Sequence, residues 1–137
     1  MTLSRTCEHP RQALLIGAPH KGNVSMHNDL AAMYSALGVR GLAPKEILSL
    51  EGYLDCGMLL GFLQGVSHRI AHWSEGELFL YVTGHGFYTG DTVEEALVGI
   101  QLHNAALGSS AHNVYWEEVF SALSIPGGVT CTMLVDH

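Results

Sequence analysis

A histidine between two glycines is the pattern in this sequence best suited to proton transfer. His85 lies between Gly84 and Gly86, directly after the apolar run at residues 78–82. An imidazole changes its charge near neutral pH, and flanking glycines allow a tight turn that leaves the backbone N–H groups accessible. His85 is therefore the first candidate catalytic residue. Because the chain has nine histidines, the alternative is an ordinary surface or hydrogen-bonded side chain.

An aspartate occupies the equivalent place after the last apolar run of the chain. Asp136 follows residues 129–135, which are predicted to form a strand. In open parallel sheets, ligands bind beyond the carboxyl ends of the strands, because loops and helix N-termini converge there. We therefore expect His85 and Asp136 to lie side by side at one edge of a sheet.

None of the three cysteines has the surroundings of a nucleophile. Cys131 lies within an apolar run and is expected to be an inert core thiol, whereas Cys56 and Cys7 lack an evident base. The cysteines are odd in number, far apart and without a C-x-x-C pair. This usage indicates reduced thiols in a cytosol and neither a disulfide framework nor a structural zinc site.

Two other groups of residues are weaker candidates for a metal. His68 and His72 are four apart on a predicted helix but do not form an H-E-x-x-H motif, so a solvated helix face is expected. Asp91, Glu94 and Glu95 offer oxygen ligands for calcium, although an ordinary acidic loop is the preferred interpretation. No metal site and no other cofactor is predicted.

The elements that must position these residues alternate between short apolar runs and amphipathic stretches. Strands are predicted at residues 13–17, 46–50, 78–82 and 129–135, with a further short strand at 96–100. Helices are predicted at residues 26–37 and 54–73 and from Asn113, as the cap, to Leu123, while residues 87–95 are read as a polar excursion.

This alternation predicts an α/β fold with a mostly parallel central sheet and helices on both faces. Residues 1–12 are interpreted as a leader and residues 13–137 as one domain. A sheet that ended at the last apolar strand would keep an unpaired edge, so further chain or a partner subunit is expected to cover it.

Composition excludes several classes of protein. The hydrophobic fraction of 47% and the charged fraction of 14% describe a compact globular chain. A net charge of −7 with only six Lys and Arg residues leaves no basic stripe for direct binding of nucleic acid. The first ten residues carry Arg5 and Glu8 and no apolar run, and no stretch reaches membrane-spanning length. A soluble, cytoplasmic protein is expected.

Four segments together resemble the caspase, metacaspase and paracaspase superfamily over nearly the whole chain. They are residues 13–17, Asn28-Asp29 opening a helix, the strand and Thr-Gly-His-Gly turn at 80–86, and the strand ending in Asp136. The resemblance implies the large-subunit part of a three-layer caspase-like fold, an incomplete half. Asp136-His137 would begin an Asp-x-Cys motif, at the separation of about 50 residues from the histidine that is typical of caspases.

This resemblance implies a cysteine endopeptidase whose nucleophile lies beyond these residues, so the chain alone is expected to be inactive. His85 would move protons, and the backbone N–H of Gly86 would help to form the oxyanion hole. Asp29 and Asp136 match positions that line the specificity pocket in metacaspases and paracaspases, which implies cleavage after Arg or Lys. The alternative is that Asp29 favours a helix N-terminus and Asp136 is a turn residue.

Two other functions stay open at this point. The first is a non-catalytic relative that acts as a regulatory or assembly module through its strand edge. The second is a flavodoxin-like domain that binds a nucleotide or small ligand. The resemblance also permits a role as an activated effector in bacterial defence, acting on a protein substrate.

Overall fold

The computed structural model describes residues 9–18, 25–52, 54–90, 92, 97–102 and 113–136. Its elements, in chain order, are β1 Arg11–Gly17, α1 Ser25–Val39, the 3-10 turn η2 Pro44–Glu46, β2 Ile47–Glu51, α2 Cys56–Ile70, β3 Gly76–Thr83, β4 His85–Thr89, β5 Leu97–Gln101, β6 Asn113–Tyr115, α3 Trp116–Ala122 and β7 Val129–Asp136.

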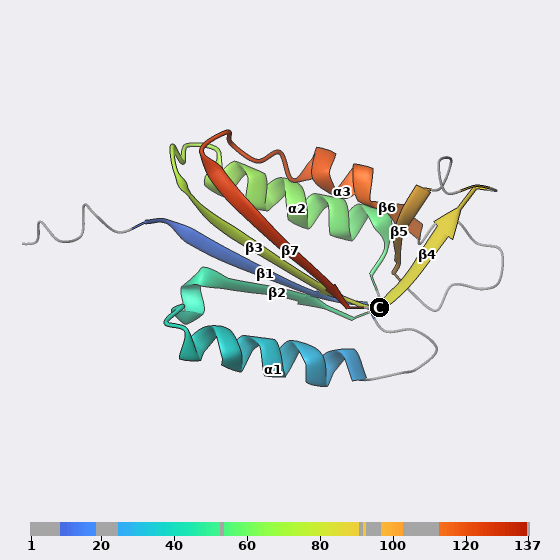
Figure 1. Cartoon of the computed structure of the whole chain (residues 1–137), viewed down its shortest axis with the longest axis horizontal. Helices are drawn as coiled ribbons and strands as arrows, with labels where there is room; N and C mark the ends of the chain where they lie inside the picture. The colour runs from blue at the N-terminus through green and yellow to red at the C-terminus, as the bar shows by residue number, and fades with distance from the viewer. Residues whose placement is uncertain are drawn as a thin grey trace, which may run out of the picture.

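Four of these strands form a parallel sheet in the order β2-β1-β3-β7. Helix α1 covers one face of the sheet, and α2 and α3 cover the other (Figure 1). The predicted α/β class, the parallel central sheet and the helices on both faces are therefore confirmed. None of the described helices is long and apolar enough to cross a membrane.

Alternate residues of the central strands supply two separate cores, because successive side chains of a strand point to opposite faces. Leu14 and Leu80 pack with α2 and α3 in the larger core, whereas Leu15 and Tyr81 pack with α1 in the smaller one. Burial on both faces explains why β1 and β3 read as continuous apolar runs in the sequence.

The structure corrects two predictions on the segment between β3 and β7. Residues 85–89, largely read as a polar excursion, form β4, and Asn113 lies in β6 and does not cap a helix. Strands β4, β5 and β6 form a second, antiparallel sheet. Gly99 permits this close pairing, because a Cβ atom there would collide with the carbonyl oxygen of Val114. The helix begins only at Trp116.

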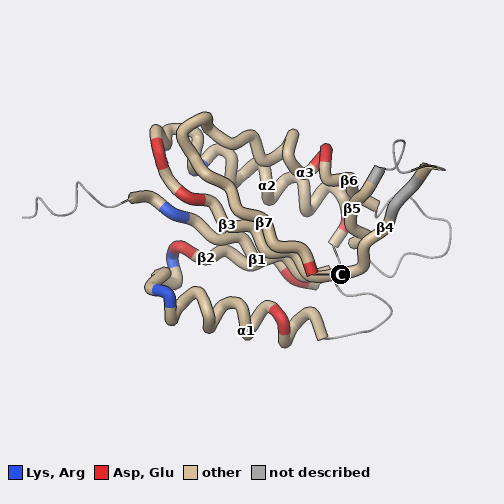
Figure 2. Tube along the Cα trace, in the orientation of Figure 1, with Lys and Arg blue, Asp and Glu red and all other residues tan. Residues whose placement is uncertain are grey.

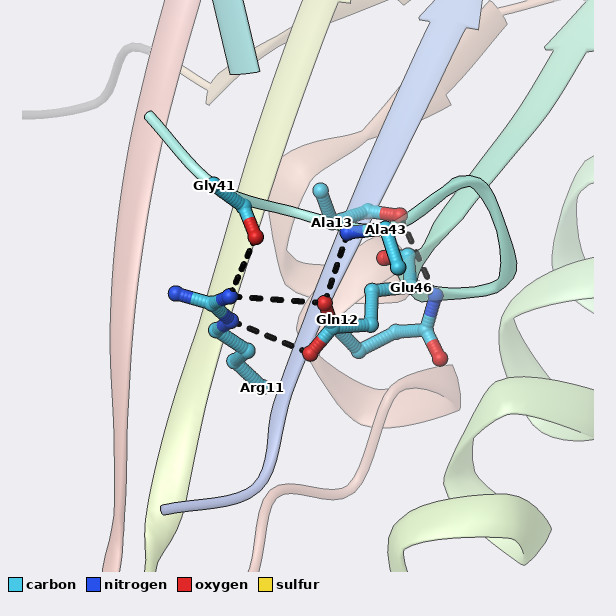
Figure 3. Close-up of polar contacts among 6 residues, drawn as sticks. All are labelled: Arg11, Gln12, Ala13, Gly41, Ala43 and Glu46. Atoms are coloured by element: carbon cyan, nitrogen blue, oxygen red, sulfur yellow. Dashed lines mark hydrogen bonds and ion pairs between the residues drawn. The ribbon is translucent and has the colours of Figure 1, made fainter. Parts of the chain in front are cut away.

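The opposite end of the parallel sheet is held by Arg11, at the amino end of β1 (Figure 3). Its Nε donates to Oε2 of Glu46 at 3.0 Å, and its Nη2 donates to the carbonyl of Gly41 at 2.6 Å. The Glu46 carboxylate also accepts from the backbone N–H of Ala43 at 2.8 Å, and Gln12 donates to the Glu46 carbonyl at 2.8 Å. β1 begins two residues earlier than predicted, and these contacts bind its start to the turn before β2.

Candidate functional site

The carboxyl ends of all four parallel strands meet at one edge of the sheet (Figure 1). Backbone N–H groups continue the pairing one residue beyond the strands: Gly52 donates to Gly17 at 3.2 Å, Ala18 to Thr83 at 3.0 Å, and Gly84 to Asp136 at 3.2 Å. The last of these bonds joins the β3 end to the β7 end. The predicted proximity of the histidine turn and Asp136 is therefore present in the structure.

Gly84 makes the bend between the two sheets, and His85 begins β4 immediately after it. A Cβ atom on Gly84 would lie 3.0 Å from Cδ1 of Ile100 and 3.2 Å from the carbonyl oxygen of Ala18, so a larger residue would press on both neighbours. The His85 side chain is exposed, and Gly86 is partly buried opposite Ile100. The predicted turn is thus confined to Gly84, and His85 stands on a strand.

Asp136 is the final residue of β7 and is tied to its neighbour strand by both backbone and side chain. Besides the bond from Gly84 to its carbonyl, its Oδ2 accepts a hydrogen bond from the hydroxyl of Tyr81 at 3.3 Å. Its side chain is exposed. The carboxylate is therefore held by β3 while it faces solvent at the carboxyl edge of the sheet.

Asp29 reaches the same place from α1. It lies beyond the first turn of the helix, which contains no acidic residue, so it is outside the region where the helix dipole acts most strongly. Its Oδ2 accepts a hydrogen bond from Oγ1 of Thr83 at 3.1 Å. Asp29 and Asp136 are thus bound by two hydroxyls on the same face of one strand, since Tyr81 and Thr83 are two residues apart on β3.

Sequence reasoning missed Tyr81 and Thr83, which it treated as part of a buried strand and its turn. Tyr81 is only 5% exposed. Burial, followed by the negative charges of Asp136 and Asp29, raises its pKa, so the phenol stays protonated and able to donate. One available signal was a pair of hydroxyl residues at alternate positions of the strand end, which must share a face.

Charge is distributed unevenly between the two ends of the sheet (Figure 2). The Lys and Arg residues in the described part of the chain all belong to segments at the amino edge: Arg11, Arg40, Lys45 and Arg69. The described carboxyl edge carries acidic residues instead, including Glu51 at the end of β2. Such an edge favours a cationic ligand over an anionic one.

Strand β7 is one of the two edge strands of the parallel sheet, and β2 is the other. Among the described residues, no strand pairs with the free side of β7. Its sequence, VTCTMLVD, lacks the Lys or Pro that commonly protects edge strands from pairing. Met133 is 37% exposed and Leu134 is 47% exposed. This strand therefore offers backbone groups and apolar side chains to a further strand.

The two cysteines within the described residues show no sign of a second reactive centre. Burial is the main reason that the pKa values of Cys56 and Cys131 are raised, and the charges of Glu118 and Asp55 add to this at Cys56. Both residues therefore favour the thiol over the reactive thiolate.

Within the described ranges, no three His, Cys, Asp or Glu side chains gather to hold a metal ion. The considered calcium ligands Asp91, Glu94 and Glu95, and also Cys7, lie outside the described residues.

Comparison with known proteins adds no relative to this geometry: no protein-family model and no curated protein matches the sequence.

Proposed function

We propose that this chain is the histidine-bearing part of a caspase-like cysteine endopeptidase with a three-layer fold, which cleaves after Arg or Lys. The observation that carries the proposal is the 3.2 Å hydrogen bond from Gly84 to the Asp136 carbonyl. Because this bond joins the two strand ends, a cysteine following Asp136 would enter the neighbourhood of His85. The proposed chemistry, peptide cleavage by a cysteine nucleophile, comes from the resemblance of both strand-end motifs to the caspase superfamily.

In the proposed reaction, a cysteine sulfur attacks the carbonyl carbon of the substrate peptide and a thioester forms as the amine leaves. His85 accepts the thiol proton and delivers it to the departing amine, and water then hydrolyses the thioester. The exposed side chain of His85 at the start of β4 is accessible to a peptide. The Gly86 N–H would contribute to the oxyanion hole.

The two aspartates support the proposed preference for basic residues. Asp136 is exposed and Asp29 is half-buried, and each uses its Oδ2 to accept a hydrogen bond from β3. In the described part of the chain, neither Oδ1 atom has a hydrogen-bond partner. Two such oxygens suit an Arg or Lys side chain, whereas an Asp side chain would be repelled.

We further propose that the complementary C-terminal part, or a partner subunit, pairs with the free edge of β7 and brings the cysteine. The eight residues of β7 pair along their whole length with β3, so the opposite edge presents an equally long row of backbone groups. Exposed Met133 and Leu134 would be covered by the same contact. The free cysteines Cys56 and Cys131 support a cytoplasmic location for the proposed enzyme.

The test is the chain assembled with the C-terminal part that supplies the cysteine. Fluorogenic peptides with Arg, Lys, Gln or Asp before the cleaved bond should be hydrolysed only when that residue is basic. His85→Ala should abolish cleavage. Asp29→Asn and Asp136→Asn should each lower kcat/KM for Arg substrates roughly ten- to hundredfold, the loss expected for a hydrogen bond to a charged group.

Two variants near the amino ends of the parallel strands, away from the candidate site, serve as controls. His72→Ala alters an exposed histidine in the turn after α2, and Glu75→Gln alters an exposed carboxylate before β3. Both should retain full activity. A folded assembly that contains the cysteine but cleaves no basic peptide, or that keeps its activity after His85→Ala, would refute the peptidase function.

The exposed edge of β7 also favours a second candidate, a non-catalytic assembly module. In that case a partner would bind β7 tightly and the complex would contain no cysteine near Asp136. Leu134→Lys on the strand would break the assembly, while His85→Ala would alter neither binding nor function. Loss of function through His85→Ala in an intact complex would exclude this candidate.

A further inference from the structure

We propose that Tyr81 is a positioning residue of the substrate pocket, whose hydroxyl holds the Asp136 carboxylate beside that of Asp29 so that both face one cationic side chain. This inference rests on the proposed function, because it takes the two aspartates to be the pocket. It goes beyond that function by assigning the pocket's geometry to a buried residue of β3.

The ring of Tyr81 is fixed in place before any ligand arrives. It is 5% exposed and belongs to the core between the sheet and α1, together with Leu15 and Leu30. A tyrosine has only two side-chain torsions, and burial of the ring in a packed core restricts both of them. The hydroxyl is therefore a rigid anchor at the carboxyl edge, whereas Asp136 alone is an exposed side chain at a strand end.

Tyr81 and Thr83 hydrogen-bond to two different elements, the neighbouring strand β7 and the helix α1. The Tyr81 hydroxyl donates to Oδ2 of Asp136 on β7 at 3.3 Å, and the Thr83 hydroxyl donates to Oδ2 of Asp29 on α1 at 3.1 Å. Alternate residues of β3 thus fasten one carboxylate each. The spacing between the carboxylates is set by a single strand, and each keeps Oδ1 for a ligand.

Neutral donors have a specific advantage in this position. A Lys or Arg anchor would orient a carboxylate but would also cancel its charge and fill the pocket with a cation. A hydroxyl orients the carboxylate and leaves the negative charge available. A tyrosine hydroxyl is protonated at neutral pH, and burial together with the charges of Asp136 and Asp29 raises the pKa of Tyr81 further in the same direction.

The experiment compares Tyr81→Phe with wild type and with Tyr34→Phe as the matched control. Tyr34 lies on α1, is 40% exposed and makes no side-chain hydrogen bond to the described residues. The probes are blocked arginine amide and blocked citrulline amide, which have similar shape and differ in charge. Binding to the 137-residue chain is measured by NMR titration, and folding is checked in the same spectra.

Tyr81→Phe should weaken arginine amide roughly tenfold, the loss typical of one such hydrogen bond, and leave citrulline amide unchanged. Tyr34→Phe should alter neither. In the assembled peptidase, the same variant should raise KM for Arg substrates with little change in kcat, because the histidine and the cysteine are untouched.

A second measurement needs no substitution. Arginine amide bound between the carboxylates places a positive charge near Tyr81, so it should lower the pKa of that phenol in a tyrosinate absorbance titration. Tyr34→Phe should keep this ligand-dependent shift, and Tyr81→Phe should remove it.

The outcomes separate the inference from the function it rests on. If Asp29→Asn and Asp136→Asn weaken arginine binding while Tyr81→Phe does not, the role of Tyr81 is wrong and the pocket stands. If wild type binds arginine and citrulline amides equally, the pocket and the inference both fail. If arginine binding requires Tyr81 but the assembled protein has no peptidase activity, the inference stands and the proposed peptidase fails.

Discussion

A methyl group added at Gly17 should push helix α1, which carries Asp29, away from the parallel sheet. Gly17 ends β1 beneath α1, and a Cβ atom there would lie 2.7 Å from Cδ1 and 3.2 Å from Cγ of Leu30. Leu30 is 5% exposed and belongs to the core between the sheet and α1, so shifting its side chain disturbs that packing. We predict that Gly17→Ala forces Leu30 and the adjacent Asp29 away from β3.

The magnitude follows from two opposing effects. Overpacking a buried position costs about 1–3 kcal/mol of the free energy of unfolding. Replacing glycine by alanine also restricts the unfolded chain, which returns about 0.4–1 kcal/mol. The two ranges combine to a net loss between about 0 and 2.6 kcal/mol, with a midpoint of roughly 1.3 kcal/mol that equilibrium unfolding resolves.

The assay is urea unfolding followed by circular dichroism, with Gly38→Ala as the matched control. Gly38 lies in α1, and a Cβ atom there would have no neighbour within 4 Å. Gly38→Ala should stabilise the protein by about 0.5–1 kcal/mol, because alanine is the better helix former. The same substitution should thus lower the free energy of unfolding at Gly17 and raise it at Gly38.

A double-mutant cycle tests the assigned contact. In a Leu30→Ala background the colliding methyl group is absent, so adding Gly17→Ala should cost nothing further. The reasoning is refuted if Gly17→Ala is as stable as wild type, or if its cost is the same with and without Leu30.

Three further predictions each concern a single residue. Asp55→Ala should lower the free energy of unfolding by about 0.5–2 kcal/mol, and Asp55→Asn by less, because Oδ1 of Asp55 caps α2 by accepting from the Met58 N–H at 2.8 Å; equal losses in urea unfolding would contradict the cap. Hydrogen bonds from Ala43 and Arg11 lower the pKa of Glu46, so its contribution to stability is complete above its ordinary pKa and is lost as the pH falls through the lowered value. Glu46→Gln should therefore flatten the decrease in urea midpoint below about pH 5, and an unchanged pH profile would count against this. Burial raises the pKa of Cys131, so mass spectrometry should find it alkylated by iodoacetamide much more slowly in the native protein than in urea; equal rates would contradict the buried thiol.

Much of the parallel sheet is predictable from the sequence because its signals are local. The run at residues 78–82 is apolar and rich in residues that favour strands, and glycines stand two residues from each of its ends. It forms the centre of β3. The same reasoning places His85 and Asp136 at strand ends. Parallel strands run in the same direction, so their carboxyl ends lie next to one another at the same end of the sheet.

Only the three-dimensional structure shows which strands pair with one another and which side chains share a face of the sheet. Residues 85–89 and 113–115 contain polar residues and glycine and become strands only because β5 lies between them. Tyr81 looks like another core residue in the sequence, yet the register of β3 against β7 puts its hydroxyl on Asp136. A local pattern reports which residues are buried, whereas a hydrogen bond between distant segments exists only once the sheet order has been chosen.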